Sequence, residues 1–246
     1  MFDAVYLERR VFMTDLSAFP ITSRWPAKNP SLLQLYSFAT PNGVKVSIML
    51  EEIGLPYEAH TVSIMQDDQK SPEFLALNPN GKIPAIIDPD GPDGRPLGLF
   101  ESGAILVYLA DKTGKLIPAD PRERFETLQW LFFQMGGVGP MFGQFGHFFR
   151  FARDKVTDPY PMQRYRDETV RLLAVLDQRL KERQWLMGDD YTIADIALFP
   201  WLRTLKVFYE ASDILQLERQ ENVMAWLERC LARPASETGL AIPPRQ

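Results

Sequence analysis

The chain has 246 residues, of which 46% are hydrophobic and 24% are charged, and this composition is that of an ordinary globular protein with a sizeable core. Its formal net charge is −5, with both signs spread along the chain, which argues against the basic surface that binds nucleic acid or anionic membranes. One cysteine, Cys230, and two histidines, His60 and His147, exclude an intramolecular disulfide and a cysteine metal cluster, and make a zinc site improbable.

The N-terminus does not read as a targeting segment. Asp3, Glu8 and Asp15 interrupt any apolar stretch there, and no small-residue cleavage site follows. No apolar run in the chain reaches the roughly 18 residues that cross a membrane. We therefore expect a protein without membrane contact, in a reducing compartment, the cytoplasm.

Residues 1–31 show no clean hydrophobic period and contain Pro20, Pro26 and Pro30. This pattern predicts an N-terminal extension, an extended arm that lies over the body of the protein or over a partner. Met13 is a candidate for the true start, and the intact mass of the natively expressed protein would decide this point.

Residues 32–117 are predicted to form one domain with a mixed sheet. Strand formers and turn signals place strands at 33–36, 57–62, 83–87 and 97–100. Thr40 is expected to cap a helix that begins at Pro41, and Ser71 and Ser102 are expected to cap two further helices. The first two strands, joined by a helix, should be parallel, and the last two, joined by a tight loop, antiparallel.

Residues 121–246 carry helical periodicity and no strand signals, and they predict an all-helical C-terminal domain. Helices are expected to start at Asp120 and Asp158, each followed by proline. Thr192 and Asp195 resemble a capping box with aspartate in place of the usual glutamate. The apolar faces expected for three of these helices comprise Phe125, Leu128, Phe132 and Met135; Tyr165, Thr169, Leu172, Leu173, Leu176 and Leu180; and Val223, Trp226, Leu227, Cys230 and Leu231.

Two short motifs are candidates for ligand binding. A cis bond between Ile83 and Pro84 would turn the backbone groups of Ile83 outward, where they could pair with an extended peptide; the alternative is an ordinary trans proline at the start of a strand. Ser102, at the start of a helix, could hold a ligand carboxylate while Glu101 pairs with a ligand ammonium; the alternative is a plain cap.

The Thr-Pro-Asn-Gly turn at residues 40–43 offers a third candidate. Thr40 and Asn42 bring a hydroxyl and a side-chain amide to the start of a helix. Donors aimed at sulfur favour thiolate over thiol, and a free thiol titrates near pH 8.5. The alternative is again simple capping, so each motif is ambiguous when taken alone.

Four motifs in this order resemble the cytosolic glutathione transferases. They are residues 40–43, residues 78–84 (Asn-Pro-Asn-Gly-Lys-Ile-Pro), residues 100–105 (Phe-Glu-Ser-Gly-Ala-Ile) and residues 191–197 (Tyr-Thr-Ile-Ala-Asp-Ile-Ala). The resemblance covers about residues 32–235. It implies a thioredoxin-like N-terminal domain, an all-helical C-terminal domain and a homodimer.

Within that superfamily the chain is most similar to the bacterial nu class, through residues 128–132 (Leu-Gln-Trp-Leu-Phe) and 136–141 (Gly-Gly-Val-Gly-Pro-Met). This resemblance implies glutathione-dependent disulfide reduction, weak conjugating or peroxidase activity, and room for two glutathiones or for glutathione disulfide. The residues it assigns are Thr40 and Asn42 at the sulfur, Gln69 and Lys82 near the glycyl end, Ile83 with Pro84 for backbone pairing, Glu101 and Ser102 at the γ-glutamyl end, and Arg164 from the helical domain.

Three further residues invite a role. Tyr36 lies where other transferase classes keep a catalytic tyrosine or serine, but its alternation with Leu33 and Leu35 fits a strand face equally well. His147, among four phenylalanines, either lines a second-substrate pocket or belongs to the core. Cys230 lies on an apolar helix face, and we expect it to be inert.

The leading hypothesis is a glutathione-dependent disulfide-bond reductase whose reactive sulfur belongs to bound glutathione and not to the protein. The enzymatic alternative is a transferase that conjugates glutathione to electrophiles or reduces organic peroxides. The non-enzymatic alternative is a glutathione-binding interaction module. No metal is expected in any of the three.

Overall fold

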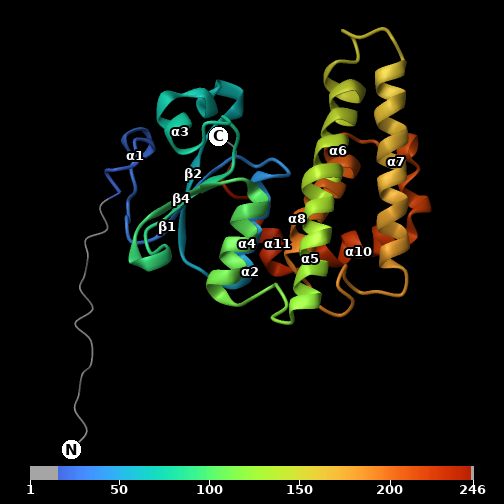
Figure 1. Cartoon of the computed structure of the whole chain (residues 1–246). Helices are drawn as coiled ribbons and strands as arrows, with labels where there is room; N and C mark the ends of the chain where they lie inside the picture. Colours follow the sequence, from blue (N-terminus) through green and yellow to red (C-terminus); the bar gives the residue numbers. More distant parts are fainter. Residues whose placement is uncertain (1–15, 245–246) are drawn as a thin grey trace, which may run out of the picture.

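The computed structural model describes residues 16–244, so the candidate start at Met13 lies outside the described residues. A sheet with its helices forms the N-terminal half, and long helices stand beside it in the C-terminal half (Figure 1). No helix within residues 16–244 has both the length and the apolar character needed to span a membrane.

The sheet has four strands in the order β2-β1-β3-β4. Their bounds are β1 Leu33–Ser37, β2 Tyr57–Thr61, β3 Ala85–Asp88 and β4 Leu97–Phe100. β1 and β2 are parallel, whereas β3 is antiparallel to both β1 and β4. The predicted mixed sheet and its pairings are therefore confirmed. β3 begins later than expected, at Ala85, where pairing with Tyr36 of β1 starts, because Pro84 has no N–H for a ladder.

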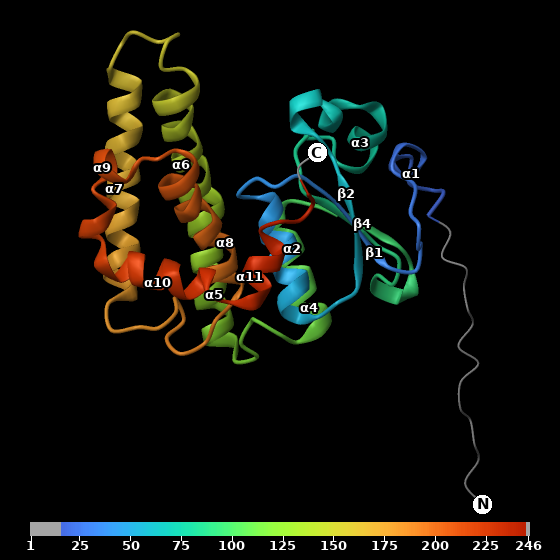
Figure 2. The same cartoon turned by 180° about the vertical axis from the view of Figure 1, so that it is seen from behind.

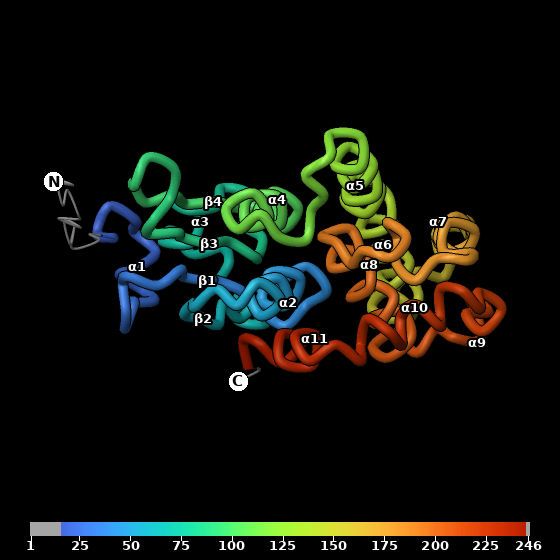
Figure 3. Tube along the Cα trace, turned by 90° about the horizontal axis from the view of Figure 1, so that it is seen from below, coloured from blue at the N-terminus to red at the C-terminus, as the bar shows by residue number. Residues whose placement is uncertain are grey.

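One face of the sheet is covered by α2 (Gly43–Ile53) and α4 (Ser102–Thr113), which lie between the strands and the helical half (Figure 3). Both helices end at a glycine with positive φ, Gly54 and Gly114, as helix C-termini commonly do. The short helix α3 (Pro72–Leu77) lies on the other face, together with α1 (Ile21–Arg24). Single turns η1 (Ile64–Gln66), η2 (Asp68–Lys70) and η3 (Pro92–Gly94) complete this half.

The described part of the N-terminal extension, residues 16–31, packs on the protein's own sheet. Leu16 and Ile21 are buried against Tyr36 in an apolar cluster separate from the main core, and the indole of Trp25 donates to the carbonyl of Thr61 at 3.0 Å. The segment therefore lies over the body of the protein, one of the two placements predicted for the arm, but it is not extended throughout, because it contains the four-residue helix α1.

The C-terminal half is helical apart from an isolated bridge between Trp185 and Gly188. The last helix, α11, returns to pack beside α2 on the N-terminal half (Figure 2). The bounds are α5 Pro121–Phe133, η4 Gln134–Val138, α6 Gly139–Gly146, η5 His147–Phe151, α7 Tyr160–Leu180, α8 Ile193–Arg203, η6 Thr204–Phe208, α9 Ser212–Leu215, η7 Leu217–Arg219, α10 Glu221–Leu231 and α11 Pro234–Gly239.

The predicted faces of α7 and α10 are buried: five of the six α7 residues, all but Tyr165, and four of the five α10 residues, all but Leu231, belong to the core. The face predicted for α5 was wrong for two of its four residues, whereas Leu128 and Met135 pack against the main core as expected. Phe125 and Phe132 are 70% and 66% exposed, and α5 instead buries Thr127 and Leu131. Two large apolar side chains, seven residues apart, therefore face outward from this helix.

Three of the predicted caps are confirmed. Ser71 accepts from the N–H of Phe74, and Asp120 accepts from two N–H groups of the first turn of α5. Thr192 and Asp195 form a complete capping box at the start of α8.

Candidate functional site

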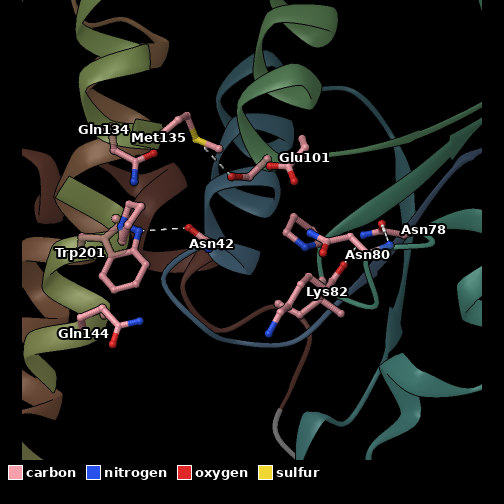
Figure 4. A pocket seen from close by; sticks show the side chains of 15 residues that line it. Asn42, Asn78, Asn80, Lys82, Glu101, Gln134, Met135, Gln144 and Trp201 are labelled. Carbon is pink, nitrogen blue, oxygen red and sulfur yellow. Dashed lines mark hydrogen bonds between the residues drawn. The ribbon is translucent and has the colours of Figure 1, made fainter. Parts of the chain in front are cut away.

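A cavity of about 410 Å³ lies between the N-terminal ends of α2 and α4, the loop before β3, and the helical half (Figure 4). Both halves of the chain contribute to it. Its walls are Asn42, Asn78, Asn80, Lys82, Ile83, Pro84, Glu101, Ser102, Gln134, Met135, Gly139, Pro140, Gly143, Gln144 and Trp201.

Asn42 lies at the start of α2 and reaches across to α8. The indole Nε1–H of Trp201 donates to Asn42 Oδ1 at 3.0 Å (Figure 4). An indole N–H can only donate, so the amide oxygen must face Trp201. The two Nδ2–H donors of Asn42 are then left for a ligand in the pocket.

The turn at residues 40–43 differs in detail from the prediction. α2 begins at Gly43 and not at Pro41, and its N-cap position is Asn42. Thr40 still satisfies the first turn, because its hydroxyl accepts from the N–H of Gly43 at 3.2 Å and its carbonyl from the N–H of Val44 at 3.0 Å. The hydroxyl hydrogen of Thr40 remains available as a donor.

The loop before β3 is held by its own asparagine. Asn78 Nδ2 donates to the carbonyl of Lys82 at 2.6 Å, and Asn78 Oδ1 accepts from the N–H of Asn80 at 3.0 Å. The Ile83–Pro84 peptide bond is cis. No backbone hydrogen bond within residues 16–244 uses the N–H or C=O of Ile83, so both groups are available to an extended peptide in the pocket.

Glu101 and Ser102 join β4 to α4. Glu101 has φ 72° and ψ 113°, a conformation that a non-glycine residue seldom adopts, and its side chain is exposed. Ser102 does not cap α4, contrary to the prediction, because the helix already begins at this residue. Its hydroxyl instead contacts Lys45 Nζ at 3.3 Å.

Lys45 is a site residue that the sequence did not reveal. Its side chain is fully buried, and Nζ donates to Gln134 Oε1 at 2.7 Å as well as approaching Ser102. Burial lowers the pKa of Lys45 to about 7, and the field of the Glu101 carboxylate partly opposes this shift. The available signal was a lone lysine inside an otherwise uncharged run, residues 43–50, all of which are buried.

Gln134 and Met135 open η4, a π-helical turn of the kind often found at functional sites. Glycines make room for this wall. A Cβ on Gly139 would lie 2.6 Å from Gln134 Nε2, and a Cβ on Gly143 would lie 3.4 Å from the Trp201 ring. The sequence pointed to residues 136–141 only through resemblance, and it gave no sign that Gln134 and Trp201 meet the first domain.

Six of the nine predicted site residues line the cavity: Asn42, Lys82, Ile83, Pro84, Glu101 and Ser102. Thr40, Gln69 and Arg164 are absent from its walls. Thr40 is on the same turn as Asn42. Gln69 lies in η2, with its carbonyl beside the position of Gly81, and Arg164 is exposed on α7.

Tyr36 and Cys230 take no part in the cavity. Tyr36 is fully buried and stacks on His60 with ring centroids 4.7 Å apart, and burial raises its pKa. Cys230 is buried in the main core, and burial raises the pKa of its thiol, which makes it a poor nucleophile. His147 is exposed beside Phe148, outside the cavity walls.

No cluster of three or more histidine, cysteine, aspartate or glutamate side chains suited to a metal ion exists within residues 16–244. The cavity instead offers amide, hydroxyl and backbone donors, a carboxylate at Glu101 and a surface ammonium at Lys82. This set suits a zwitterionic peptide ligand, because both signs of charge and an unpaired backbone edge face the same space.

Two family models match the chain: "Glutathione S-transferase, N-terminal domain" over residues 39–112 and "Glutathione S-transferase, C-terminal domain" over residues 140–234. The chain belongs to the glutathione S-transferase family. The disulfide-bond oxidoreductase YfcG of Escherichia coli is 46% identical over 86% of this chain and 94% of its own length, and the disulfide-bond oxidoreductase YghU of the same organism is 41% identical over 84% and 73%.

Solved structures agree with this assignment. A glutathione transferase from Burkholderia graminis, with two glutathione molecules bound per subunit, superposes with a TM-score of 0.94 at 59% identity and covers 99% of this chain and 100% of its own. A glutathione transferase from Pseudomonas putida, with one glutathione disulfide bound per subunit, superposes with a TM-score of 0.91 at 60% identity. It covers 93% of this chain and 99% of its own. The predicted family, and its nearness to disulfide-bond oxidoreductases, are confirmed.

Proposed function

We propose that this protein is a glutathione-dependent disulfide-bond reductase that holds the glutathione thiolate beside Asn42 and Thr40. The observation that carries the proposal is the Trp201–Asn42 hydrogen bond, which leaves the amide hydrogens of Asn42 as donors toward the cavity. Two relatives with more than 40% identity are named disulfide-bond oxidoreductases, and two similar structures hold two glutathiones or glutathione disulfide.

The tripeptide would lie between two anchors. At the first anchor, the free backbone groups of Ile83 pair with the backbone of the cysteinyl residue of glutathione. At the second, Glu101 binds the ammonium and Ser102 the carboxylate of the γ-glutamyl group. Gln69 and Lys82 would serve the glycyl end. Arg164 would need to reach in from α7, since it does not line the cavity.

The thiolate would then attack a disulfide substrate. Its sulfur forms a bond to one substrate sulfur while the substrate S–S bond breaks, and the second substrate sulfur leaves as a thiolate that takes up a proton. A second glutathione thiolate attacks the mixed disulfide, forms glutathione disulfide and releases the remaining substrate thiol. Two donors worth about 1.5–3 kcal/mol each are enough to lower the glutathione thiol pKa by one to two units.

Three variants test this mechanism. Asn42→Ala should lose most of the glutathione-dependent reduction of 2-hydroxyethyl disulfide, Thr40→Ala a smaller part, and Cys230→Ala none. Full activity in Asn42→Ala with loss in Cys230→Ala would refute it. Assays with 1-chloro-2,4-dinitrobenzene and with an organic peroxide test the transferase alternative. If that alternative is right, the protein turns over one of these substrates fast and reduces 2-hydroxyethyl disulfide slowly. Tight glutathione binding without any turnover would instead support an interaction module.

We further propose a homodimer with domains at residues 32–117 and 121–246 after an extension at 1–31. Each matched family model falls inside one proposed domain. Phe125 and Phe132 on α5 are exposed apolar side chains that a partner subunit would cover. Sedimentation equilibrium of the wild type and of Phe125→Ser/Phe132→Ser tests this; a wild-type monomer would contradict it.

A further inference from the structure

Lys45 is a buried ammonium directly behind the cavity wall. Its Nζ lies 3.3 Å from Ser102 Oγ, 2.7 Å from Gln134 Oε1 and 3.9 Å from Met135 Sδ. These three neighbours are neutral, and the charged side chain whose field acts on Lys45 is Glu101. A buried charge without a close counter-charge is costly, so the lysine is poorly compensated by the protein alone.

The direction of hydrogen bonding from Lys45 fixes that of Ser102. An ammonium can only donate, so Ser102 Oγ accepts from Lys45 and its own hydrogen points elsewhere. In the structure this hydrogen faces Met135 Sδ, 3.8 Å from Ser102 Oγ, a weak acceptor that a ligand carboxylate would displace. Ser102 lines the cavity and is the first residue of α4, where the backbone N–H groups of the first turn have no partner within the helix. A ligand anion at this point would accept the hydroxyl hydrogen of Ser102. Only the Ser102 oxygen would then separate the anion from the ammonium of Lys45.

We propose that Lys45 is a positioning residue that turns Ser102 into a donor for the α-carboxylate of the γ-glutamyl group and supplies the buried positive charge that pairs with that carboxylate. The inference rests on the proposed glutathione site. It assigns ligand selection to a side chain that never touches the ligand: compounds that carry the carboxylate are favoured over otherwise identical compounds that lack it. Burial lowers the pKa of Lys45 to about 7, so the ammonium form predominates below that pH, and a bound carboxylate would favour it further.

The test is equilibrium binding by calorimetry of two probes at pH 6, where the ammonium form of Lys45 predominates. One is S-methylglutathione, whose blocked sulfur cannot titrate or react, and the other is its analogue with hydrogen in place of the α-carboxylate. The readout is the ratio of the two dissociation constants, measured in the wild type, in Lys45→Met and in Lys115→Met. Lys115 is a suitable control because its Nζ also donates at 2.8 Å, but to the carbonyl of Ile53 away from the cavity.

The wild type and Lys115→Met should prefer S-methylglutathione strongly and equally. In Lys45→Met this preference should fall about tenfold or more, the range of a charge-assisted hydrogen bond, while the analogue binds as before. An unchanged ratio in Lys45→Met, or an equal loss for both probes, would show a merely structural lysine and overturn the inference.

A wild type that binds neither probe would refute the proposed glutathione site itself, and the two failures are therefore distinct. If Lys45→Met does not fold because Gln134 Oε1 loses its partner, Lys45→Met/Gln134→Leu is compared with Gln134→Leu. The same fall in the ratio is expected between these two variants, and an unchanged ratio between them would equally overturn the inference.

Discussion

The indole of Trp201 and the amide of Asn42 form a 3.0 Å hydrogen bond between residues 159 positions apart in sequence. It joins α8 of the helical half to the start of α2, which follows the interior strand β1. Because the indole N–H must donate, it also decides which end of the amide faces the cavity. The helical half therefore orients the very group that we assign to the glutathione sulfur.

Trp201→Phe removes this donor and lets the Asn42 amide rotate. We expect kcat/KM for disulfide reduction to fall about tenfold, the effect of losing roughly 1.4 kcal/mol of transition-state stabilisation, and the pKa of bound glutathione to rise. Ultraviolet thiolate absorbance against pH measures the second quantity. Trp25→Phe is the matched control, since its indole also donates at 3.0 Å but to the Thr61 carbonyl. Equal losses in both variants would contradict the assignment.

Lys45 should make the stability of the ligand-free protein depend on pH. Unfolded, a lysine keeps its proton up to about pH 10, whereas in the fold burial lowers the pKa of Lys45 to about 7. Between these pH values the unfolded state binds more protons, so the free energy of unfolding should rise with pH, by about 1 kcal/mol per pH unit for one proton.

Urea unfolding at several pH values between 7 and 9 measures this slope against Lys45→Met, which lacks the titrating group. The difference in unfolding free energy, wild type minus variant, should increase with pH across the window. A difference that stays flat or decreases would show that Lys45 does not titrate there.

Asp195 is surrounded by donors alone. Its two carboxylate oxygens accept from the N–H groups of Leu186 and Thr192, the Thr192 hydroxyl and the indole of Trp226. Asp195→Asn would place an NH₂ group against some of these donors, and we expect a loss of about 2–4 kcal/mol in unfolding free energy. Chemical denaturation measures it. The exposed Asp189→Asn should change stability little, and a similarly small effect at Asp195 would refute the argument.

Local patterns in the sequence were enough for most of the sheet and of the helices. The parallel pairing of β1 and β2 follows from the helix between them. The apolar period of α7 predicted which of its residues are buried, and the capping box at Thr192 predicted where α8 begins. These features depend on residues close in sequence. The outward face of α5 was missed because periodicity locates an apolar stripe without saying what covers it.

The candidate site could be predicted only on one side. Asn42, Ile83 and Ser102 belong to short motifs at the ends of strands and helices, so neighbouring residues in the sequence are enough to suggest their roles. Gln134 and Trp201 come from helices whose placement depends on packing between the two halves. No periodicity in either segment specifies that contact. The role of the buried Lys45 could not be predicted either, because its partners Ser102 and Gln134 are distant in sequence.

Gly43 sets how closely α2 approaches the strand before it. A Cβ at this position would lie 1.9 Å from the carbonyl oxygen of Phe38 and 2.6 Å from Ser37 Oγ, and the first of these contacts is with backbone that cannot swing away. Gly43→Ala must therefore push the start of α2, and Asn42 with it, away from β1. We expect a stability loss of about 1–3 kcal/mol, as in overpacked cores, together with a weaker affinity for glutathione.

Thermal unfolding and glutathione titration of Gly43→Ala, with Gly136→Ala as control, measure both effects. A Cβ on Gly136 meets no atom within 4 Å, and alanine suits a helical position better than glycine, so this control should keep its stability and affinity. If Gly43→Ala binds glutathione as the wild type does, then the position of Asn42 does not depend on the close approach of α2, and this prediction is wrong.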